Sequence, residues 1–402
     1  MNYPQLEKFM QRHGTSFYLF YPQRFCQNLA DIQDNLTRIY SNSLVCYAYK
    51  ANYMPILGGY LEQQGIRGEV VSGMEYNIAR MHLPGEYIVF NGPCKSLSEI
   101  SRAVDEGALV NIDSFQEIQL IEKLLQDKSL VEVGLRVNFD MGTGQSRFGF
   151  SYEDGDVLRA ADRLYASNKV RIVSLHSHFT TRERSLELFK RRTDGMLAIY
   201  NAFPYKKDIK FLNLGGGFFG PMSAEAKSKL SVPVPTFAEY AQVIAGEFYK
   251  VFGEKGPALA IEPGVSMIAD SMEFVAQILD KRKVRGKTIL TIDGSTNILY
   301  PTASRYALDY KVISKNQDLN NEYCDVTGYT CMESDVLLSD VQIAAEPGDF
   351  MVFKNRGAYS NVYKPPFIKA APAILGLNGE VFARPQSFED VIAPYNLSCP
   401  PL

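Results

Sequence analysis

The chain has 402 residues, of which 46% are apolar and 22% charged, and its formal net charge at pH 7 is −3. These values are ordinary for globular proteins, and this length predicts two domains rather than one. The slightly negative charge argues against a nucleic acid or an anionic membrane as a partner.

The cysteines and the chain's hydropathy indicate the compartment. Neither the first eight residues nor any stretch of 18 residues is apolar enough for a signal peptide or a membrane span. The cysteines are scattered and form neither a disulfide framework nor a zinc-type pattern, so no metal site is predicted. The sequence therefore predicts a soluble, reduced, cytoplasmic protein. The cysteines are Cys26, Cys46, Cys94, Cys324, Cys331 and Cys399.

Apolar runs that end in polar or glycine-rich residues alternate with segments of helical spacing over the first two thirds of the chain. A strand at residues 14–22 and a helix at 22–40 come first. Eight strand-like runs follow, at residues 44–48, 68–75, 87–93, 109–114, 131–138, 171–178, 211–217 and 258–264. Helical stretches such as 54–64, 114–126 and 185–203 separate most of them. This alternation predicts an α/β fold, a (β/α)8 barrel of the TIM type, over residues 24–265.

The pattern changes after residue 266. Short strand-like runs now lie between turns rich in Gly, Asn, Asp and Pro, which predicts a β-rich domain of the sandwich or barrel kind. This second domain is expected to combine residues 1–23 with residues 266–402. The runs are 274–279, 288–292, 335–338, 350–353 and 380–384.

The lysine that follows the first barrel strand is the most informative single residue. Lys50 comes directly after the apolar run 44–48 and the tyrosine at 49. Burial lowers the pKa of an ammonium group, and a neutral amine is a nucleophile that can form a Schiff base. On spacing alone, a strand whose last lysine lies in solvent is the favoured interpretation, and the other motifs described below reverse it.

Three other strand ends carry candidate site residues. The run Gly215-Gly216-Gly217 can bring backbone N–H groups close to an anion such as phosphate, although a plain tight turn has the same pattern. Glu262 could keep a ring nitrogen protonated, or could be a solvated surface carboxylate. His178 ends a predicted strand, where barrel enzymes place catalytic groups, but a lone histidine is often structural.

The second domain contributes two further candidates. Cys331 stands beside Glu333 and Asp335, and the alternative for this thiol is a buried, inert cysteine. Tyr359 follows Arg356-Gly357-Ala358 in a turn-like segment that carries no information by itself.

Taken together, these motifs resemble the pyridoxal phosphate (PLP) decarboxylases of the alanine-racemase-like fold, which include ornithine, arginine and diaminopimelate decarboxylases. The resemblance extends from about residue 14 to residue 370. Its motifs, in order, are Tyr47-Ala48-Tyr49-Lys50-Ala51-Asn52, Val71-Ser72-Gly73-Met74-Glu75, Leu175-His176-Ser177-His178, Gly215-Gly216-Gly217, Glu262-Pro263-Gly264, Cys331–Asp335 and Gly357-Ala358-Tyr359.

The resemblance implies a role for each motif. Lys50 would bind PLP covalently, His178 would stack on the ring, Glu262 would pair with the ring nitrogen, and Arg136 would lie near the phenolic oxygen. Cys331 or Lys50 would protonate Cα after CO2 leaves. The phosphate would be held by Gly215, Gly216, Gly217, Gly264, Tyr359 and the hydroxyl of Thr181. The family's homodimer would share its active sites across the interface, with the Cys331 loop crossing it.

The departures from the family's pattern concern the substrate. Thr180-Thr181 replaces a Gly-Ser pair after the stacking histidine, and Val265 replaces an arginine after Glu262-Pro263-Gly264. Met332 stands where diamine-forming enzymes carry an acidic residue, with Glu333 one place on. The arginine expected near residue 300 in diaminopimelate enzymes is missing, and Arg305 is the nearest. Met332, Glu333, Asp335 and Arg305 are therefore the candidate substrate residues.

These departures favour the branch of specialised biosynthesis, in which the amino acid is tethered to a carrier or built into a siderophore precursor. The alternative is a decarboxylase of free diaminopimelate, ornithine or lysine. A racemase on the same scaffold and an inactive decarboxylase-like binding protein remain further alternatives. The presence of Lys50, Glu262 and Cys331 argues against the inactive protein, and Cys331 suits decarboxylation better than racemisation.

Overall fold

A computed structural model describes residues 1–126, 128–179, 183–228, 230, 232–299, 308–363 and 366–395. The chain divides into two compact units. The barrel unit consists of Cys26–Pro221 and Val232–Met267, and the sheet unit consists of Met1–Phe25, Met222–Ser231 and Ile268–Leu402. Each unit has its own nine-stranded sheet.

In the barrel unit, eight parallel strands close on themselves, because β5 pairs with β6 at the two ends of the order β5-β4-β3-β2-β10-β9-β8-β6. The predicted (β/α)8 barrel is confirmed. Its strands are β2 (Ser43–Ala48), β3 (Arg67–Val70), β4 (Ile88–Phe90), β5 (Leu109–Ile112), β6 (Val131–Asn138), β8 (Val170–His176), β9 (Phe211–Asn213) and β10 (Ala258–Ile261), and a two-residue strand, β7 (Phe150–Ser151), pairs with β6.

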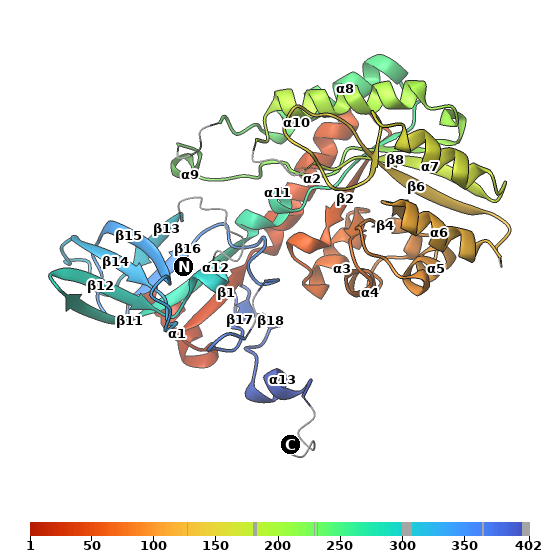
Figure 1. The fold of residues 1–402 in the computed structure, drawn as a ribbon. Helices are drawn as coiled ribbons and strands as arrows, with labels where there is room; N and C mark the ends of the chain where they lie inside the picture. Colours follow the sequence, from red (N-terminus) through yellow and green to blue (C-terminus); the bar gives the residue numbers. More distant parts are fainter. Residues whose placement is uncertain are drawn as a thin grey trace. The chain divides into compact units, whose positions relative to one another are not determined.

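Helices surround the barrel strands (Figure 1). They are α2 (Pro22–Ile39), α3 (Pro55–Gln63), α4 (Gly73–Ala79), α5 (Leu97–Asp105), α6 (Phe115–Leu124), α7 (Asp156–Tyr165), α8 (Leu186–Ala202) and α10 (Phe237–Phe252). Hydroxyl N-caps fix where several of them begin, because the side chain accepts a hydrogen bond from a backbone N–H of the first turn. These caps are Ser72, Ser96, Ser114, Ser185 and Thr236.

The sheet unit is mostly antiparallel, with the order β15-β14-β12-β11-β1-β17-β18, and β16 pairs with β11 on one side and with β13 on the other (Figure 1). The predicted β-rich second domain is confirmed, and the first strand of the chain lies at the centre of its sheet. The strands are β1 (Ser16–Phe20), β11 (Met272–Val284), β12 (Lys287–Ile292), β13 (Tyr310–Ile313), β14 (Glu322–Thr327), β15 (Val336–Ile343), β16 (Phe350–Phe353), β17 (Ala373–Leu375) and β18 (Val381–Ala383).

A helix that the sequence pattern did not predict, α1 (Tyr3–His13), packs on this sheet. Asn2 caps it and forms a reciprocal pair of hydrogen bonds with Gln5. Its buried Leu6 and Phe9 join a core with Phe17 and Leu19 of β1. The shorter helices of the chain are α9 (Ala224–Ser228), α11 (Val265–Ile268), α12 (Thr296–Leu299) and α13 (Phe388–Ile392). Within the described residues, no helix has the length and apolar character needed to cross a lipid bilayer.

Candidate active site

Polar side chains converge inside the barrel at the carboxyl ends of its strands. Alternate residues of each strand point to the barrel interior, so residues at matching register positions on neighbouring strands meet there. Arg136 of β6 pairs in register with His176 of β8, which pairs with Asn213 of β9. His176 and Asn213 are buried. The strand register thus brings together residues that lie far apart in the sequence.

Glu262 follows β10 directly and is the centre of this cluster. Its Oε1 accepts hydrogen bonds from Nδ2 of Asn91 and Nδ2 of Asn213, each at 2.7 Å. Its Oε2 lies 3.1 Å from Nε2 of His176. Burial by itself would raise the pKa of Glu262, but His176, and after it Lys50, outweigh burial and lower the pKa below its usual range. Glu262 is therefore held as a carboxylate.

Lys50 lies in a 3₁₀ helix of one turn, Tyr49–Ala51, that follows β2. Its Nζ forms an ion pair with the Glu69 carboxylate, which reaches it from β3. The Lys50 side chain is 29% exposed while that of Glu69 is 1% exposed, so the amine is the accessible member of the pair. Nδ2 of Asn91 also lies 3.0 Å from Oε1 of Glu69 and thereby links the lysine pair to the Glu262 cluster.

His178 is held against the glycine-rich turn. The backbone N–H of Gly216 donates to Nδ1 of His178 at 3.0 Å. Nδ1 is therefore the acceptor, and the ring's proton is on Nε2. Burial, reinforced by the charge of Lys50, lowers the pKa of His178 well below its ordinary value. The ring is consequently neutral at physiological pH, and a neutral ring can stack on another ring without the cost of desolvating a charge.

Arg136 extends from β6 into the same region. Its Nη1 lies 3.0 Å from Oδ1 of Asp113, and its Nη2 donates to the main-chain oxygen of His178 at 3.1 Å. The guanidinium also lies 4.6 Å from the centre of the Phe148 ring. Arg136 therefore connects the backbone at His178 to the buried carboxylate that follows β5.

The glycine run after β9 meets a steric requirement at each position. Gly215 and Gly217 have φ values of +66° and +102°, in the region that disfavours other residues. A Cβ on Gly216 would lie 2.2 Å from the main-chain oxygen of Glu262, whereas the nearest atom to a Cβ on Gly217 would be 3.9 Å away. The turn is thus crowded on its barrel side and open at Gly217. Gly264 is also confined, since a Cβ added at this position would lie 2.9 Å from the Cβ of Ala51.

These residues fit pyridoxal phosphate. An accessible amine, a buried carboxylate and a neutral imidazole lie in one network. The open turn at Gly217 offers a place where backbone can approach a phosphate without an intervening side chain.

Glu75, on α4, adds a second buried acid beside Lys50 and Glu69. Its Oε2 accepts a hydrogen bond from the N–H of Val71 at 2.8 Å. Burial raises the pKa of Glu75 to about 7, helped by the charge of Glu69 and opposed by the Val71 hydrogen bond and by Lys50. Glu75 is therefore an acid of this region that titrates near neutral pH.

In the sheet unit, the Cys331 loop presents its first residues to solvent. Cys331 and Glu333 are exposed, and Met332 is 42% exposed. The alternative of a buried, inert cysteine is therefore wrong for Cys331.

Asp335 differs from the residues before it because it is buried. Its Oδ1 accepts from the N–H of Thr296 at 2.7 Å and its Oδ2 from Oγ1 of Thr330 at 2.6 Å. These bonds favour a role for Asp335 in shaping its own loop over contact with a substrate.

The remaining candidates are placed only in part. Tyr359 has a φ of +53°, a strained value for a residue with a large side chain, and its ring centre lies 6.1 Å from that of Tyr363. Thr181 and Arg305 lie outside the described residues, so the structure says nothing about them.

The sequence interpretation missed the residues that hold the candidate site in place: Glu69, Asn91, Asp113, His176 and Asn213. One signal was present. His176 precedes His178 by two residues, and Glu69 and Asn213 occupy inward positions of their strands, so the period-two pattern could have flagged them.

The comparisons agree with this geometry. Residues 24–269 match the family model described as pyridoxal-dependent decarboxylase, pyridoxal binding domain. The diaminopimelate decarboxylase of Helicobacter pylori strain 26695 is 28% identical over 371 residues, covering 88% of each chain.

Solved structures show the same fold. The crystal structure of diaminopimelate decarboxylase from M. jannaschii has a TM-score of 0.86 and 23% identity, covering 98% of this chain and 94% of that one. The arginine decarboxylase of Paramecium bursaria Chlorella virus, bound to agmatine, has a TM-score of 0.74 and 18% identity, covering 90% and 96%.

Proposed function

The chain belongs to the pyridoxal-dependent decarboxylase family, and from that premise we propose that it removes the α-carboxylate of a free amino acid of the diaminopimelate type. Reaction class and cofactor follow from the family: the protein is a PLP-dependent amino-acid decarboxylase. The observation that supports the proposed site most strongly is the network that joins Lys50, Glu69 and Glu262 through Asn91.

In this proposal the residues of the candidate site divide the work of binding the cofactor and moving protons. When bound, PLP supplies a ring that accepts the electron pair released as CO2 leaves. Lys50 attaches the cofactor and later accepts or donates a proton at Nζ. Glu262, an ionised carboxylate, keeps a proton on the adjacent ring nitrogen. His178 offers the face of a neutral ring, and Gly215–Gly217 offers backbone to the phosphate.

Glu69 would hold the lysine amine when it is not bound to the cofactor. The ion pair between them is buried on the carboxylate side and accessible on the amine side. A lysine released from the cofactor therefore has a defined position to return to, close to Glu262 rather than in solvent.

The substrate class rests on the relatives. Diaminopimelate decarboxylases from Helicobacter pylori and Aquifex aeolicus match 88% of this chain, at 28% and 23% identity. A diaminopimelate-type substrate has a second charged end, which needs a polar partner because an unpaired buried charge is costly. Glu333 is exposed next to Met332, so in this proposal its carboxylate pairs with the charged end of the substrate. Asp335 is buried and already hydrogen-bonded within its own loop.

A conjugated or carrier-tethered amino acid, as in a siderophore precursor, is the second candidate. One observation favours it: Met332 is exposed and uncharged at the place where diamine-forming relatives carry an acid. Val265 likewise offers no charge where an arginine is common. A larger substrate whose far end is not a bare amine would suit such a surface.

The substrate class can be tested by measuring CO2 release with purified holoenzyme. The panel contains meso-diaminopimelate, L-ornithine, L-lysine, a citrate-linked amino acid and a carrier-bound aminoacyl group. The proposal expects the highest kcat/KM for diaminopimelate. Selective turnover of a linked substrate would replace it with the second candidate, and no CO2 from any member would contradict both.

We also propose a homodimer with shared active sites, in which Cys331 of one subunit serves the Lys50 of the other. The exposure of Cys331 on its own chain supports this arrangement. Neither Lys50→Ala nor Cys331→Ala should form clean amine product at the wild-type rate, and mixing the two proteins under subunit exchange should restore part of this amine formation. Absence of any restored activity despite proven exchange would contradict shared sites.

A further inference from the structure

Several inward positions of the barrel below the Glu262 cluster carry small side chains. Barrels of this kind are normally filled by layers of bulky, branched residues. Cys46, Gly134, Ser174 and Ala260 are the small residues one layer down, beside larger ones such as Val89 and Phe211. A Cβ on Gly134 would lie 1.7 Å from Oδ1 of Asn111, so the structure enforces a small residue there. This layer therefore leaves space beneath the candidate active site.

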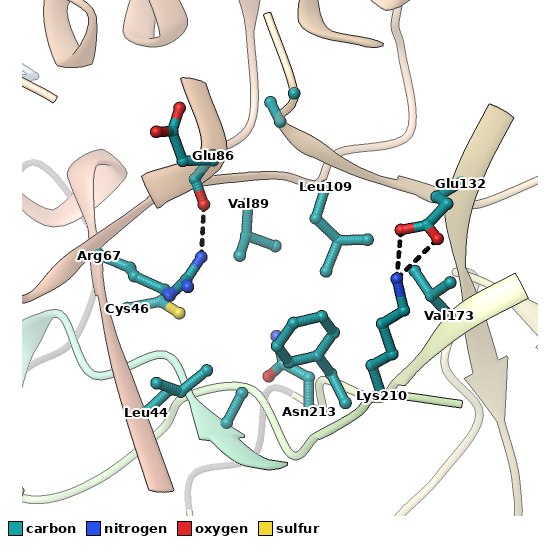
Figure 2. A pocket seen from close by; sticks show the side chains of 14 residues that line it. Leu44, Cys46, Arg67, Glu86, Val89, Leu109, Glu132, Val173, Lys210 and Asn213 are labelled. Carbon is teal, nitrogen blue, oxygen red and sulfur yellow. Dashed lines mark hydrogen bonds and ion pairs between the residues drawn. The ribbon is translucent and has the colours of Figure 1, made fainter. Parts of the chain in front are cut away.

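A cavity of about 260 Å³ lies in this part of the barrel (Figure 2). Its lining includes Arg67 and Leu109, the first residues of β3 and β5, and Lys210, which precedes β9, whereas Lys50 follows the carboxyl end of β2. Since one water takes up ~30 Å³ in the liquid, the cavity has room for a ligand of roughly eight heavy atoms. Apolar side chains form part of its wall, and they come from Leu44, Val89, Leu109, Val173, Phe211 and Ala260.

Most polar groups that line the cavity already have partners. Nζ of Lys210 contacts both carboxylate oxygens of Glu132, at 2.6 and 2.7 Å, and forms a neutral pair with it. Asn213 donates to Glu262 and accepts from the N–H of Gly215. Burial raises the pKa of the Cys46 thiol, so Cys46 contributes a neutral surface.

Arg67 is the exception. Its side chain points from the start of β3 towards the cavity, and its Nη1 donates to the main-chain oxygen of Glu86 (Figure 2). Within the described part of the chain, no carboxylate lies within 4.0 Å of this guanidinium, the distance that defines an ion pair. A guanidinium has five N–H donors in a planar fork that matches the two oxygens of a carboxylate.

We propose that this cavity is a second ligand site, which binds a small aliphatic monocarboxylate. The ligand's carboxylate pairs with Arg67, and its hydrocarbon part fills the space between Val89, Leu109 and Ala260. One negative charge on the ligand balances the Arg67 guanidinium, which has a main-chain oxygen and the Tyr87 ring as partners but no carboxylate. The proposal is independent of the substrate of the decarboxylase.

Hexanoate, with eight heavy atoms, is a suitable probe, and hexylamine and 1-hexanol have the same six-carbon chain with one heavy atom fewer. The test measures binding to the PLP-loaded protein by isothermal titration calorimetry. Hexanoate should bind with 1:1 stoichiometry, and the amine and the alcohol should bind at least ~10-fold more weakly, the difference expected from a charge-assisted hydrogen bond. Equal binding of all three probes would overturn the proposal.

Two variants locate the site. Arg67→Gln should weaken hexanoate binding ~10-fold or more, and Ala260→Val should weaken it by filling the cavity. Arg171→Gln is the matched control, because Arg171 also lies near the start of a strand, β8, but does not line the cavity. Unchanged affinity in folded Arg67→Gln protein, or equal weakening by Arg171→Gln, would overturn the assignment even if Ala260→Val fails to fold.

Discussion

The two units place their candidate functional groups in opposite surroundings. In the barrel unit, Glu262 and Glu69 are buried and hydrogen-bonded, and they hold Lys50 and His176 around them. In the sheet unit, Cys331 and Met332 are exposed. In the function proposed above, the interior of the barrel unit sets up the chemistry of the cofactor, whereas an exposed loop of the sheet unit contacts the substrate. Barrel variants should therefore slow every substrate, and loop variants should change selectivity or products.

Glu262→Gln should have the largest effect on the rate. A neutral amide cannot keep the ring nitrogen protonated, so decarboxylation should slow by ~10²–10⁴-fold for every substrate while the protein still folds and binds PLP. The measurement is kcat for CO2 release. Glu273→Gln, which changes a buried carboxylate bound to Tyr21 in the sheet unit, is the control. Wild-type turnover in Glu262→Gln would exclude this role.

Cys331→Ala should separate CO2 release from protonation. If Cys331 is the acid at Cα, CO2 is still released, but protonation becomes slow or misdirected, and an aldehyde or ketone appears together with the amine form of the cofactor. Product analysis by mass spectrometry against total CO2 measures the split. Clean amine formed at the wild-type rate would show that the exposed loop does not supply the proton.

Glu75→Gln tests the barrel network through stability. The pKa of Glu75 rises from 4.5 to about 7 in the folded protein, so between these values the folded state binds a proton that the unfolded state has lost. Stability should therefore fall as pH rises from about 4.5 to 7, by up to ~3 kcal/mol at 1.36 kcal/mol for each pKa unit. Glu75→Gln should reduce this slope in urea denaturation of the cofactor-free protein. The same slope in both proteins would mean that Glu75 is not the group responsible.

Met332→Asp should have the smallest effect. A carboxylate at this exposed position can pair with a distal ammonium, but exposed ion pairs contribute only ~0.2–1 kcal/mol, so kcat/KM for ornithine and lysine should rise by less than ~10-fold. Wild-type activity on both is expected to be poor. Efficient wild-type turnover of either would indicate that Glu333 already pairs with the distal amine.

Much of the fold could be predicted from sequence because the barrel strands are short apolar runs with clear ends. Strands β13 and β14 were missed because their residues alternate with polar ones at the surface of the sheet unit, as in Glu322-Tyr323-Cys324-Asp325. Helix α1 was missed because only Leu6 and Phe9 mark its buried face.

The candidate site was predicted from motifs that are continuous in sequence, such as the segments around Lys50 and Glu262. Its supporting residues could not be found in this way. Asn91 matters because one amide reaches both Glu69 and Glu262, and only the register of the closed barrel brings these three strands' residues together. Whether Lys210 has a carboxylate partner, or Arg67 lacks one, likewise depends on which side chains meet in space.

Lys50 is the residue proposed to bind the cofactor covalently, and borohydride reduction tests this role most directly. Reduction of the PLP-loaded protein fixes the cofactor to the lysine that holds it, and peptide mass mapping then identifies that residue. The label is expected on Lys50, with no covalent label in Lys50→Ala. A label on another lysine, such as Lys95, which is buried against Glu117 in the same unit, would contradict this role of Lys50.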